Sequence, residues 1–338
     1  LDHNPSLRNF SPRVGVTWAP TGKGSTILDA GFGIYYDQIL EFVADSRGLS
    51  PPFYNNVQIV SLNPFDYFSS ALAAAAAQPG NKVQALIMDY QHMSSPMVFR
   101  YSAALRQQLP GGWRGSLTYV GARGNHLYRA YEINQFTVPV RQANGSLLFP
   151  KGLTGINPAF GSINLLASDA QSFYNALQVS GNRSFGRGSS VNVNYTFSKS
   201  IDDTSNFGTT NESIQYGLQR TLDRAISDFN IRHRLTTSFF YALPFGSQGP
   251  WLKSGVGAHL LGGWRLGGIF SDRTGTPINI RMNVRNGETL FAANRPNLLP
   301  GRSGNPIKGV FGNCYNVRPE YVGLPVGTPD HYYDPCAF

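Results

Sequence analysis

The sequence predicts an all-β fold: an antiparallel transmembrane β-barrel, of which the chain holds about eight strands. Three observations predict it, namely segments in which apolar and polar residues alternate, connections that are alternately short and long, and a scarcity of charges. Charged residues make up 14% of the 338 residues, below the ~25% usual for soluble domains. Aromatic residues reach 13%, and 37 glycines and 22 prolines supply turns. This composition favours a β-protein whose surface does not all face water.

The predicted strands alternate with a period of two, because successive side chains of a β-strand point to opposite faces. In the clearest segment, Val191, Val193 and Tyr195 alternate with Asn192 and Asn194. About ten such residues are what a tilted barrel strand needs to cross a membrane. The alternating segments, in chain order, are residues 13–18, 28–36, 97–106, 113–119, 177–183, 191–198, 231–243 and 264–271.

The connections between these segments differ in length in a regular order. Glycine-containing turns at 21–24, 110–112 and 186–188 are short, and a Gly- and Pro-rich connection follows residue 243. In outer-membrane barrels, short turns face the periplasm and long loops face outside. A soluble sandwich gives no reason for such an order, so we interpret residues 1–338 as one portion of a barrel. The long loops are expected at about residues 38–95, 126–171, 201–229 and 275–338.

Tryptophans lie close to the short connections. Trp18, Trp113 and Trp264 are each within a few residues of one, where a periplasmic aromatic girdle of a barrel would sit. A second group suits the outer girdle, nearer the long loops. The alternative is that these are ordinary core aromatics of a soluble β-protein. The second group consists of Tyr36, Phe99, Tyr119, Phe173 and Phe197.

Arginines fall on the polar phase of the predicted strands, with Arg183 as an exception. An arginine that faces lipid at mid-depth costs ~2–4 kcal/mol, so we expect the polar-phase arginines to face the lumen. Much of the formal net charge of +9 is then a property of the lumen. No dense Lys/Arg run is present, which argues against a nucleic-acid partner. The lumen-facing candidates are Arg13, Arg100, Arg106, Arg114, Arg232, Arg234 and Arg265.

The two cysteines, Cys314 and Cys336, both lie near the C-terminus. In an exported chain such a pair most often forms one loop-closing disulfide, and we expect that here. Two free thiols are the alternative, which a cytosolic location would favour. No apolar run approaches the ~20 residues of a membrane-spanning helix. The first residues lack a signal peptide, so the chain is expected to begin downstream of its true start.

No constellation of catalytic residues is present, and we do not expect an enzyme or a cofactor. Gly31-Phe32-Gly33 lacks the third glycine of a dinucleotide fingerprint, and Gly22-Lys23-Gly24-Ser25 lacks the upstream glycine of a phosphate loop. The six histidines show no metal-ligand spacing. Asp202 and Asp203, with the oxygens of the next residues, could hold Ca²⁺, but a polar loop at a strand end explains them better.

Two further groups have a structural and a binding interpretation. Asp228 with Arg232 and Arg234 could form an ion-pair network in the lumen, and structural pairing is favoured over ligand contact. The long loops could carry binding residues on a rigid scaffold. The aromatics of 63–68 and 332–334 could touch a saccharide or a peptide, but simple packing of the loops is favoured.

Short strings spread along the chain resemble TonB-dependent receptors of the Oar-like type. Each is weak alone, and together they keep the order of that family. The strings are Phe10-Ser11-Pro12-Arg13-Val14-Gly15, Gly31-Phe32-Gly33-Ile34-Tyr35-Tyr36-Asp37, Tyr119-Val120-Gly121-Ala122-Arg123-Gly124-Asn125-His126-Leu127, Tyr174-Asn175-Ala176-Leu177-Gln178-Val179, Tyr195-Thr196-Phe197-Ser198-Lys199-Ser200-Ile201-Asp202-Asp203, Asp228-Phe229-Asn230-Ile231-Arg232-His233-Arg234, Leu243-Pro244-Phe245-Gly246, Gly262-Gly263-Trp264-Arg265-Leu266, Gly275-Thr276-Pro277 and Tyr333-Asp334-Pro335-Cys336-Ala337-Phe338.

The resemblance implies a bacterial outer-membrane transporter with long loops outside, lipid around its wall and a barrel of ~22 strands with a plugged lumen. It also implies contact with the TonB complex, through a plug and a TonB box that this stretch does not contain. The substrate would be large, such as a peptide, a protein or a saccharide. The competing hypothesis is a structural or adhesive surface protein that is built from the same barrel and transports nothing.

Overall fold

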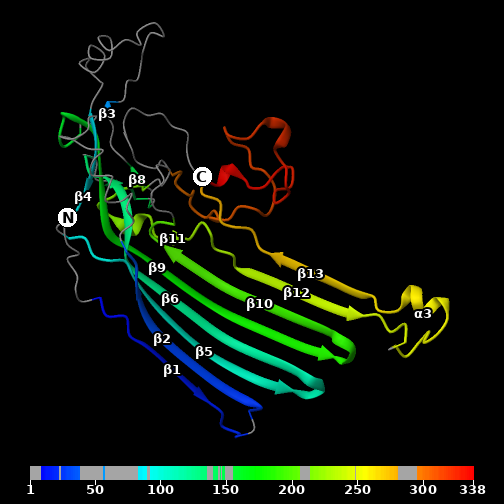
Figure 1. Ribbon diagram of the computed structural model, residues 1–338. Coiled ribbons are helices and arrows are strands. Elements are labelled where there is room, and N and C mark those ends of the chain that lie inside the picture. Colours follow the sequence, from blue (N-terminus) through cyan, green and yellow to red (C-terminus); the bar gives the residue numbers. More distant parts are fainter. Residues whose placement is uncertain are drawn as a thin grey trace, which may run out of the picture.

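The computed structural model describes residues 9–22, 24–38, 56–57, 83–89, 92–134, 140–143, 145, 147–148, 155–205, 214–247, 249–280 and 295–338. Eight strands form an antiparallel meander, in which each strand pairs with the one before and the one after it (Figure 1). This confirms the predicted all-β class. The strands are β1 (Arg13–Trp18), β2 (Thr26–Tyr36), β5 (Met97–Leu109), β6 (Trp113–Glu132), β9 (Phe160–Phe185), β10 (Ser189–Asp202), β12 (His233–Ala242) and β13 (Arg265–Arg273).

The strand register sorts the side chains of the sheet onto two faces. Leu28, Leu105, Leu117 and Val179 are consecutive cross-strand partners, so they line one face. Their neighbours along each strand point to the opposite face, which carries mainly small and polar residues. We call these the apolar face and the polar face. Large side chains of the apolar face are exposed, among them Leu117 and Leu177, because no layer of the described chain packs over this part of the sheet.

The connections at one end of the sheet are compact (Figure 1). Two are single 3-10 turns, η2 (Pro110–Gly112) and η3 (Gly186–Gly188). Gly111 and Gly112 adopt positive φ angles of 73° and 78°, which a glycine accepts without a steric penalty. The connection from β12 to β13 is longer and contains the short helix α3 (Val256–Leu261). We call this end of the sheet the turn end and the opposite end the loop end.

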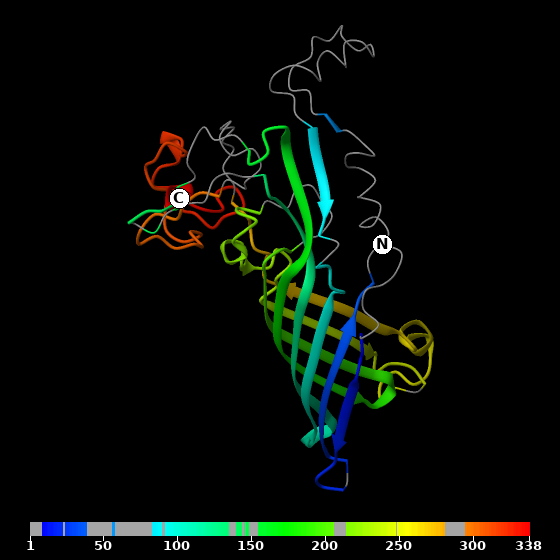
Figure 2. The same cartoon turned by 90° about the vertical axis from the view of Figure 1, so that its left-hand side faces the viewer.

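At the loop end, β6 and β9 continue well beyond the ~10 residues expected of a membrane strand. Figure 2 shows β9 and β4 (Val83–Met88) rising side by side above the shorter strands. β4 runs parallel to β9, and β3 (Asn56–Val57) pairs with β4. A separate pair is formed by β7 (Val140–Arg141) and β8 (Leu147–Leu148).

Two predicted long loops therefore need correction: 38–95 contains β3 and β4, and 126–171 contains the ends of β6 and β9. The alternation fails here because the upper part of β9 is covered on both faces: Leu166, Ala167 and Ala170 are all buried. A strand buried on both faces does not alternate in polarity. Met88, Met93, Tyr128 and Leu166 form a small core at this end.

The other two predicted loops contain little regular structure. The 201–229 region holds the last residues of β10, the 3-10 turn η4 (Arg220–Leu222) and the two-residue strand β11 (Ala225–Ile226), which pairs with β10. Beyond residue 275, the described residues form no strand, but only the 3-10 turns η5 (Pro319–Tyr321) and η6 (Pro335–Ala337) and an isolated bridge.

Among the described residues, no helix has the length and hydropathy that crossing a membrane requires.

Candidate functional site

The three predicted girdle tryptophans all lie at the turn end. Trp18 is the last residue of β1, Trp113 is the first residue of β6, and Trp264 immediately precedes β13. The Trp113 ring lies 6.0 Å from the guanidinium carbon of Arg183, which also sits 4.6 Å from the Phe185 ring. This stacking explains the exceptional phase of Arg183: it shares the apolar face with Trp113 at the turn end of the sheet, where its charge can reach water.

The tryptophans are displaced from one another in a regular way. Through the register, Trp18 lies level with Leu117, four residues above Trp113 towards the loop end. Trp264 pairs with Leu243, four residues below the level of Trp113. The line through them thus drifts by eight residues over the seven strand steps from β1 to β13.

This drift has a geometric meaning. At ~3.3 Å per residue along a strand and ~4.8 Å between strands, it corresponds to strands tilted by about 38° from the normal to that line. Strands of outer-membrane barrels are tilted by ~35–45°. Three tryptophans that share one plane, as at a membrane interface, would be displaced in this manner.

The polar face carries six of the seven predicted lumen arginines. Arg13 and Arg100 lie 4.5 and 5.2 Å from the ring of Tyr35 on the same face. Arg106 donates two hydrogen bonds of 2.7 Å to Asp29, which also accepts one from Thr17. The strand register places the other three on the same face, namely Arg114, Arg234 and Arg265.

Arg232 departs from the prediction. It lies at a bend just before β12, and its guanidinium carbon is 5.7 Å from the ring of Phe197 on the apolar face. The bend breaks the alternation on which the prediction relied. The expected network of Asp228 with Arg232 and Arg234 is also not formed: in the described part of the chain, no ion pair joins them, and the Asp228 amide donates to Ser205 Oγ.

At the loop end, aspartates line a hollow of about 410 Å³ between the end of β10, β11 and residues 277–279, 295 and 304. Asp202 accepts from Ser205 Oγ at 2.9 Å, and Asp203 lies 3.3 Å from Arg220. Asp223 lies 3.2 Å from Arg295, and burial raises the pKa of its carboxyl. Each of these three carboxylates already has a partner, and no group of three metal-ligating residues occurs among the described ones. The calcium interpretation therefore gains no support.

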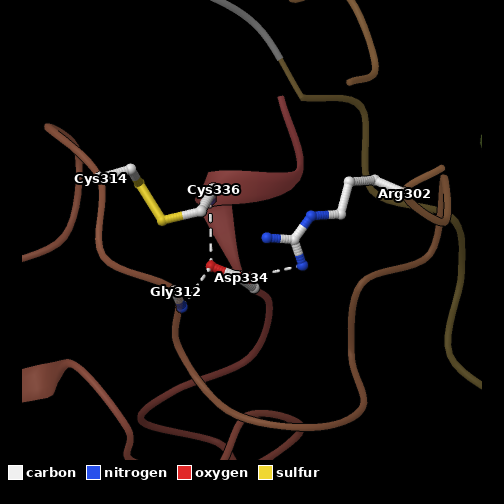
Figure 3. The surroundings of a disulfide bond; sticks show 5 residues. All are labelled: Arg302, Gly312, Cys314, Asp334 and Cys336. Atoms are coloured by element: carbon white, nitrogen blue, oxygen red, sulfur yellow. Dashed lines mark hydrogen bonds and ion pairs between the residues drawn. A yellow bond between two sulfur atoms is a disulfide. The ribbon is translucent and has the colours of Figure 1, made fainter. Parts of the chain in front are cut away.

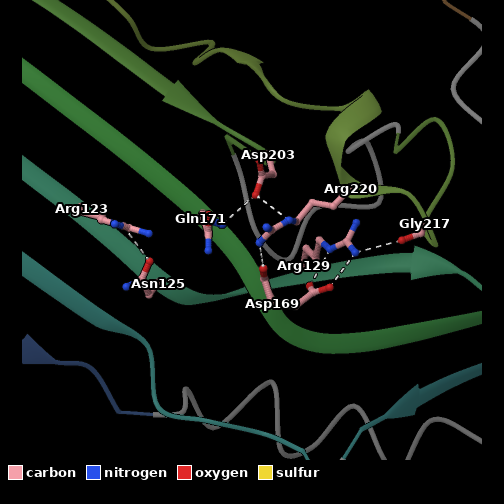
Figure 4. A network of polar contacts seen from close by, with 8 residues as sticks. All are labelled: Arg123, Asn125, Arg129, Asp169, Gln171, Asp203, Gly217 and Arg220. Carbon is pink, nitrogen blue, oxygen red and sulfur yellow. Dashed lines mark hydrogen bonds and ion pairs between the residues drawn. The ribbon is translucent and has the colours of Figure 1, made fainter.

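Next to the hollow, a buried network of arginines and aspartates joins the upper parts of β6 and β9 to the 214–223 segment (Figure 4). Arg129, which is 2% exposed, donates to both oxygens of Asp169 at 2.6 and 2.7 Å and to the Gly217 carbonyl at 2.9 Å. Arg220 donates to the Asp169 carbonyl and pairs with Asp203. The network fixes the irregular segment on the extended strands.

Glu132, at the end of β6, has a related structural role above the regular sheet. Its carboxylate accepts from the amides of Asn134 at 2.6 Å and Ile163 at 2.9 Å. Burial nevertheless raises its pKa, because these hydrogen bonds do not fully replace lost hydration. Neither Arg129 nor Glu132 was predicted from the sequence. The sequence signal is weak, since it consists of charged residues in a stretch without alternation.

The C-terminal residues form a small lobe that is closed by a disulfide (Figure 3). Cys314 and Cys336 are bonded, as predicted, at an S–S distance of 2.04 Å. Asp334 accepts from the amides of Cys336 at 3.0 Å and Gly312 at 3.3 Å. Asp334 is therefore a structural residue of the lobe, whereas Tyr332 is exposed. The other aromatics suggested for substrate contact, at 63–68, lie outside the described residues.

A match to a known family agrees with this architecture. Residues 3–338 match the family model described as "Outer membrane beta barrel domain". None of the curated proteins matches the sequence. Among solved structures, the outer membrane transporter YddB from Escherichia coli is similar, with 13% identity and a TM-score of 0.41; the match covers 68% of this chain and 26% of that one. The chain thus spans about a quarter of the length of YddB. By its match over nearly the whole sequence, the chain belongs to the outer membrane β-barrel domain family.

Proposed function

We propose that the chain forms part of the wall of a TonB-dependent outer-membrane transporter of the Oar-like type. The apolar face would contact lipid, the polar face would line the lumen, and the loop end would lie outside the cell. Substrate specificity would then belong to the long connections, as binding residues often sit on loops that a rigid scaffold positions. The substrate class that fits a wide, polar, arginine-containing lumen is a large polar molecule such as a peptide, a protein or a saccharide.

The observation that carries this proposal is the slanted line of tryptophans on the apolar face. Its tilt of about 38° agrees with that of barrel strands. On the same face, ten residues separate Trp113 from Arg123 along β6. At that tilt, ten residues rise about 25 Å, the height of the apolar band of an outer-membrane barrel. A soluble sheet has no reason to combine these two dimensions.

The two edge strands of the sheet indicate that it belongs to a larger barrel. In the described part of the chain, β1 and β13 each pair with one strand only. Unpaired backbone groups are too costly in hydrocarbon, so spanning sheets close on themselves. We therefore expect further strands to complete the wall, as in the ~22-stranded barrels of this class. A plug and a TonB-contacting segment would be contributed by other parts of such a protein.

The membrane arrangement can be tested in the full-length protein with a fluorophore placed on either face of β6. Leu117→Cys and Thr118→Cys are neighbours that differ only in the face they occupy. A lipid-borne quencher should quench the label at position 117 several times more than the label at 118, and a water-soluble quencher should do the reverse. Equal quenching at the two positions by both reagents would rule out a lipid-facing wall.

The transport assignment needs a separate test, which asks whether full-length protein in detergent retains a purified periplasmic TonB domain. Retention that is lost when the segment upstream of the barrel is deleted supports the transporter. A lipid-facing wall without any TonB binding would favour the structural or adhesive alternative, for which the disulfide-closed lobe outside the sheet is a suitable contact surface.

A further inference from the structure

Basic side chains gather on the apolar face at the loop end of the sheet. Arg123 and Lys199 occupy apolar-face positions by register, since their partners include Phe173 and Asn175. The guanidinium of Arg224, in the connection before β11, lies 4.8 Å from the ring of Phe173. Arg232 reaches the same face over the ring of Phe197. We call these four residues the basic border.

The basic border follows the slant of the tryptophan line. A cross-strand row at the turn end serves as the reference, and it consists of Trp113, Arg183, Val191 and Phe239. We count residues along each strand from this row towards the loop end. Arg123 of β6 lies ten residues above the row, Lys199 of β10 eight residues, and Arg232, just before β12, seven residues. The position of these residues along the strands therefore falls by about one residue per strand. This corresponds to one horizontal line across strands tilted by about 35°, close to the tilt of about 38° found from the tryptophans. The basic border is the upper limit of the apolar band.

The charges of the basic border are not neutralised within the described part of the chain. All four side chains are exposed, and none has a carboxylate within ion-pair distance there. By contrast, Arg106 on the polar face and Arg129 in the loop-end network each bind an aspartate. The acidic side chain placed on the apolar face by register is Asp272 of β13, beside Leu235.

Aromatic rings orient two of these arginines. Arg123 and Arg224 lie 5.1 and 4.8 Å from the same ring, that of Phe173. Arg123 Nε donates to Asn125 Oδ1 at 3.3 Å, so its two terminal nitrogens remain for another acceptor. Figure 4 shows Arg123 and Asn125 well apart from the Arg129 network. A planar guanidinium that is held by a ring favours bidentate binding of a phosphate group.

We propose that the basic border binds the phosphate groups of anionic lipids in the membrane leaflet at the loop end. The position of the basic border favours lipid phosphates as its ligand. Its charges lie on the face that meets lipid, at the edge of the apolar band, where headgroup phosphates are found. Juxtamembrane Lys and Arg are attracted to anionic lipid by about 1 kcal/mol each. The inference requires the apolar face to meet lipid, but it does not depend on TonB-driven transport.

The test uses the full-length protein in detergent, titrated with phosphatidylglycerol or with phosphatidylcholine, and counts bound lipids by native mass spectrometry. The variant is Arg123→Gln with Arg224→Gln. The matched control is Arg114→Gln with Arg234→Gln, which removes the same charge from the polar face of the same sheet. Phosphatidylglycerol affinity should fall about fivefold per charge removed from the basic border, and it should change less than twofold in the control.

Several outcomes would overturn the proposal. Unchanged phosphatidylglycerol binding in the border variant would do so, as would an equal loss in the control, because net charge alone would then explain the effect. Inorganic phosphate that displaced the lipid at equal concentration would indicate a free-anion site. Folding is checked by heat-modifiable electrophoretic mobility. If the double variant fails to fold, Arg224→Gln alone serves, because Arg224 lies outside the strands.

Discussion

The lower and upper halves of β6 differ in how regularly they pair with the neighbouring strands. From Trp113 to Gly124, each residue keeps its face and its register with both neighbouring strands. Between Gly124 and Arg129 the register with β9 shifts twice, and His126 takes a φ of 56° that non-glycine residues rarely adopt. Below the shifts, Arg123 is exposed and has no carboxylate partner in the described chain, whereas Arg129 above them is buried and bound to Asp169.

This difference shows what determines the sequence in each half. In the lower half, the environment on either side of the sheet dictates only polarity, so alternation is the dominant pattern. In the upper half, particular partners dictate each residue, and bulges turn side chains towards them. Changes in the lower half should therefore depend on the face that they alter, and changes in the upper half on the contact that they remove.

The largest effect is expected from a charge on the apolar face within the band. Val179→Arg should destabilise the folded full-length protein by ~2–4 kcal/mol, since the arginine would face lipid near mid-depth. Gln178→Arg, on the opposite face of the same strand, should stay within about 0.5 kcal/mol, as surface substitutions usually do. The measurement is equilibrium unfolding by denaturant in lipid vesicles. Similar losses for the two variants would contradict the assignment of the faces.

Next comes reduction of the Cys314–Cys336 disulfide, which closes a chain segment with a sequence separation of 22. Chain-entropy reasoning gives about 3 kcal/mol for a loop of this size. The loss should be confined to the lobe, where Phe311, Val317 and Val326 pack around Cys336. Hydrogen exchange should accelerate in residues 309–338 after reduction and stay constant in β9 and β10. Faster exchange in those strands would contradict an independent lobe.

A smaller effect is expected from the upper half of β6. Asp169→Asn removes the carboxylate from buried Arg129, and the side chain of Asp169 is 45% exposed. Breaking a fully buried pair costs ~3–5 kcal/mol, and partial exposure reduces this to about 2 kcal/mol. Hydrogen exchange in residues 128–132 and 164–168 should accelerate accordingly. Arg123→Gln, on the same strand as Arg129, is the control and should leave these segments unchanged.

The smallest effect concerns pH. Burial raises the pKa of Glu132 above its ordinary 4.5, so the ionised form is disfavoured in the folded state. Its destabilising contribution is present at neutral pH and is removed as the pH falls through the folded pKa towards 4.5. Opening of the Glu132–Ile163 contact should become rarer on acidification. It is measured by hydrogen exchange of the Ile163 amide, corrected for the intrinsic exchange rate at each pH. Glu132→Gln should abolish this pH dependence.

How much could be predicted from the sequence follows the same division. The eight strands, their order and the polar phase of Arg106 or Arg234 could be predicted, because period-two alternation reports faces directly. The Cys314–Cys336 bond could also be predicted, since no other pairing exists. The upper parts of β6 and β9 could not, because strands covered on both faces do not alternate. Arg232 was misplaced because a bend resets the phase.

β9 also has a mechanical consequence. Its 26 residues extend without interruption from the turn end into the region above the band, a length of about 85 Å at ~3.3 Å per residue. A pull along β9 from above would load its many cross-strand hydrogen bonds to β6 and β10 together, in shear. A pull along the edge strand β1, which has six residues and one paired neighbour among the described strands, would load far fewer hydrogen bonds. Force applied at the loop end is therefore passed to the rest of the sheet through the strand with the most cross-strand pairs.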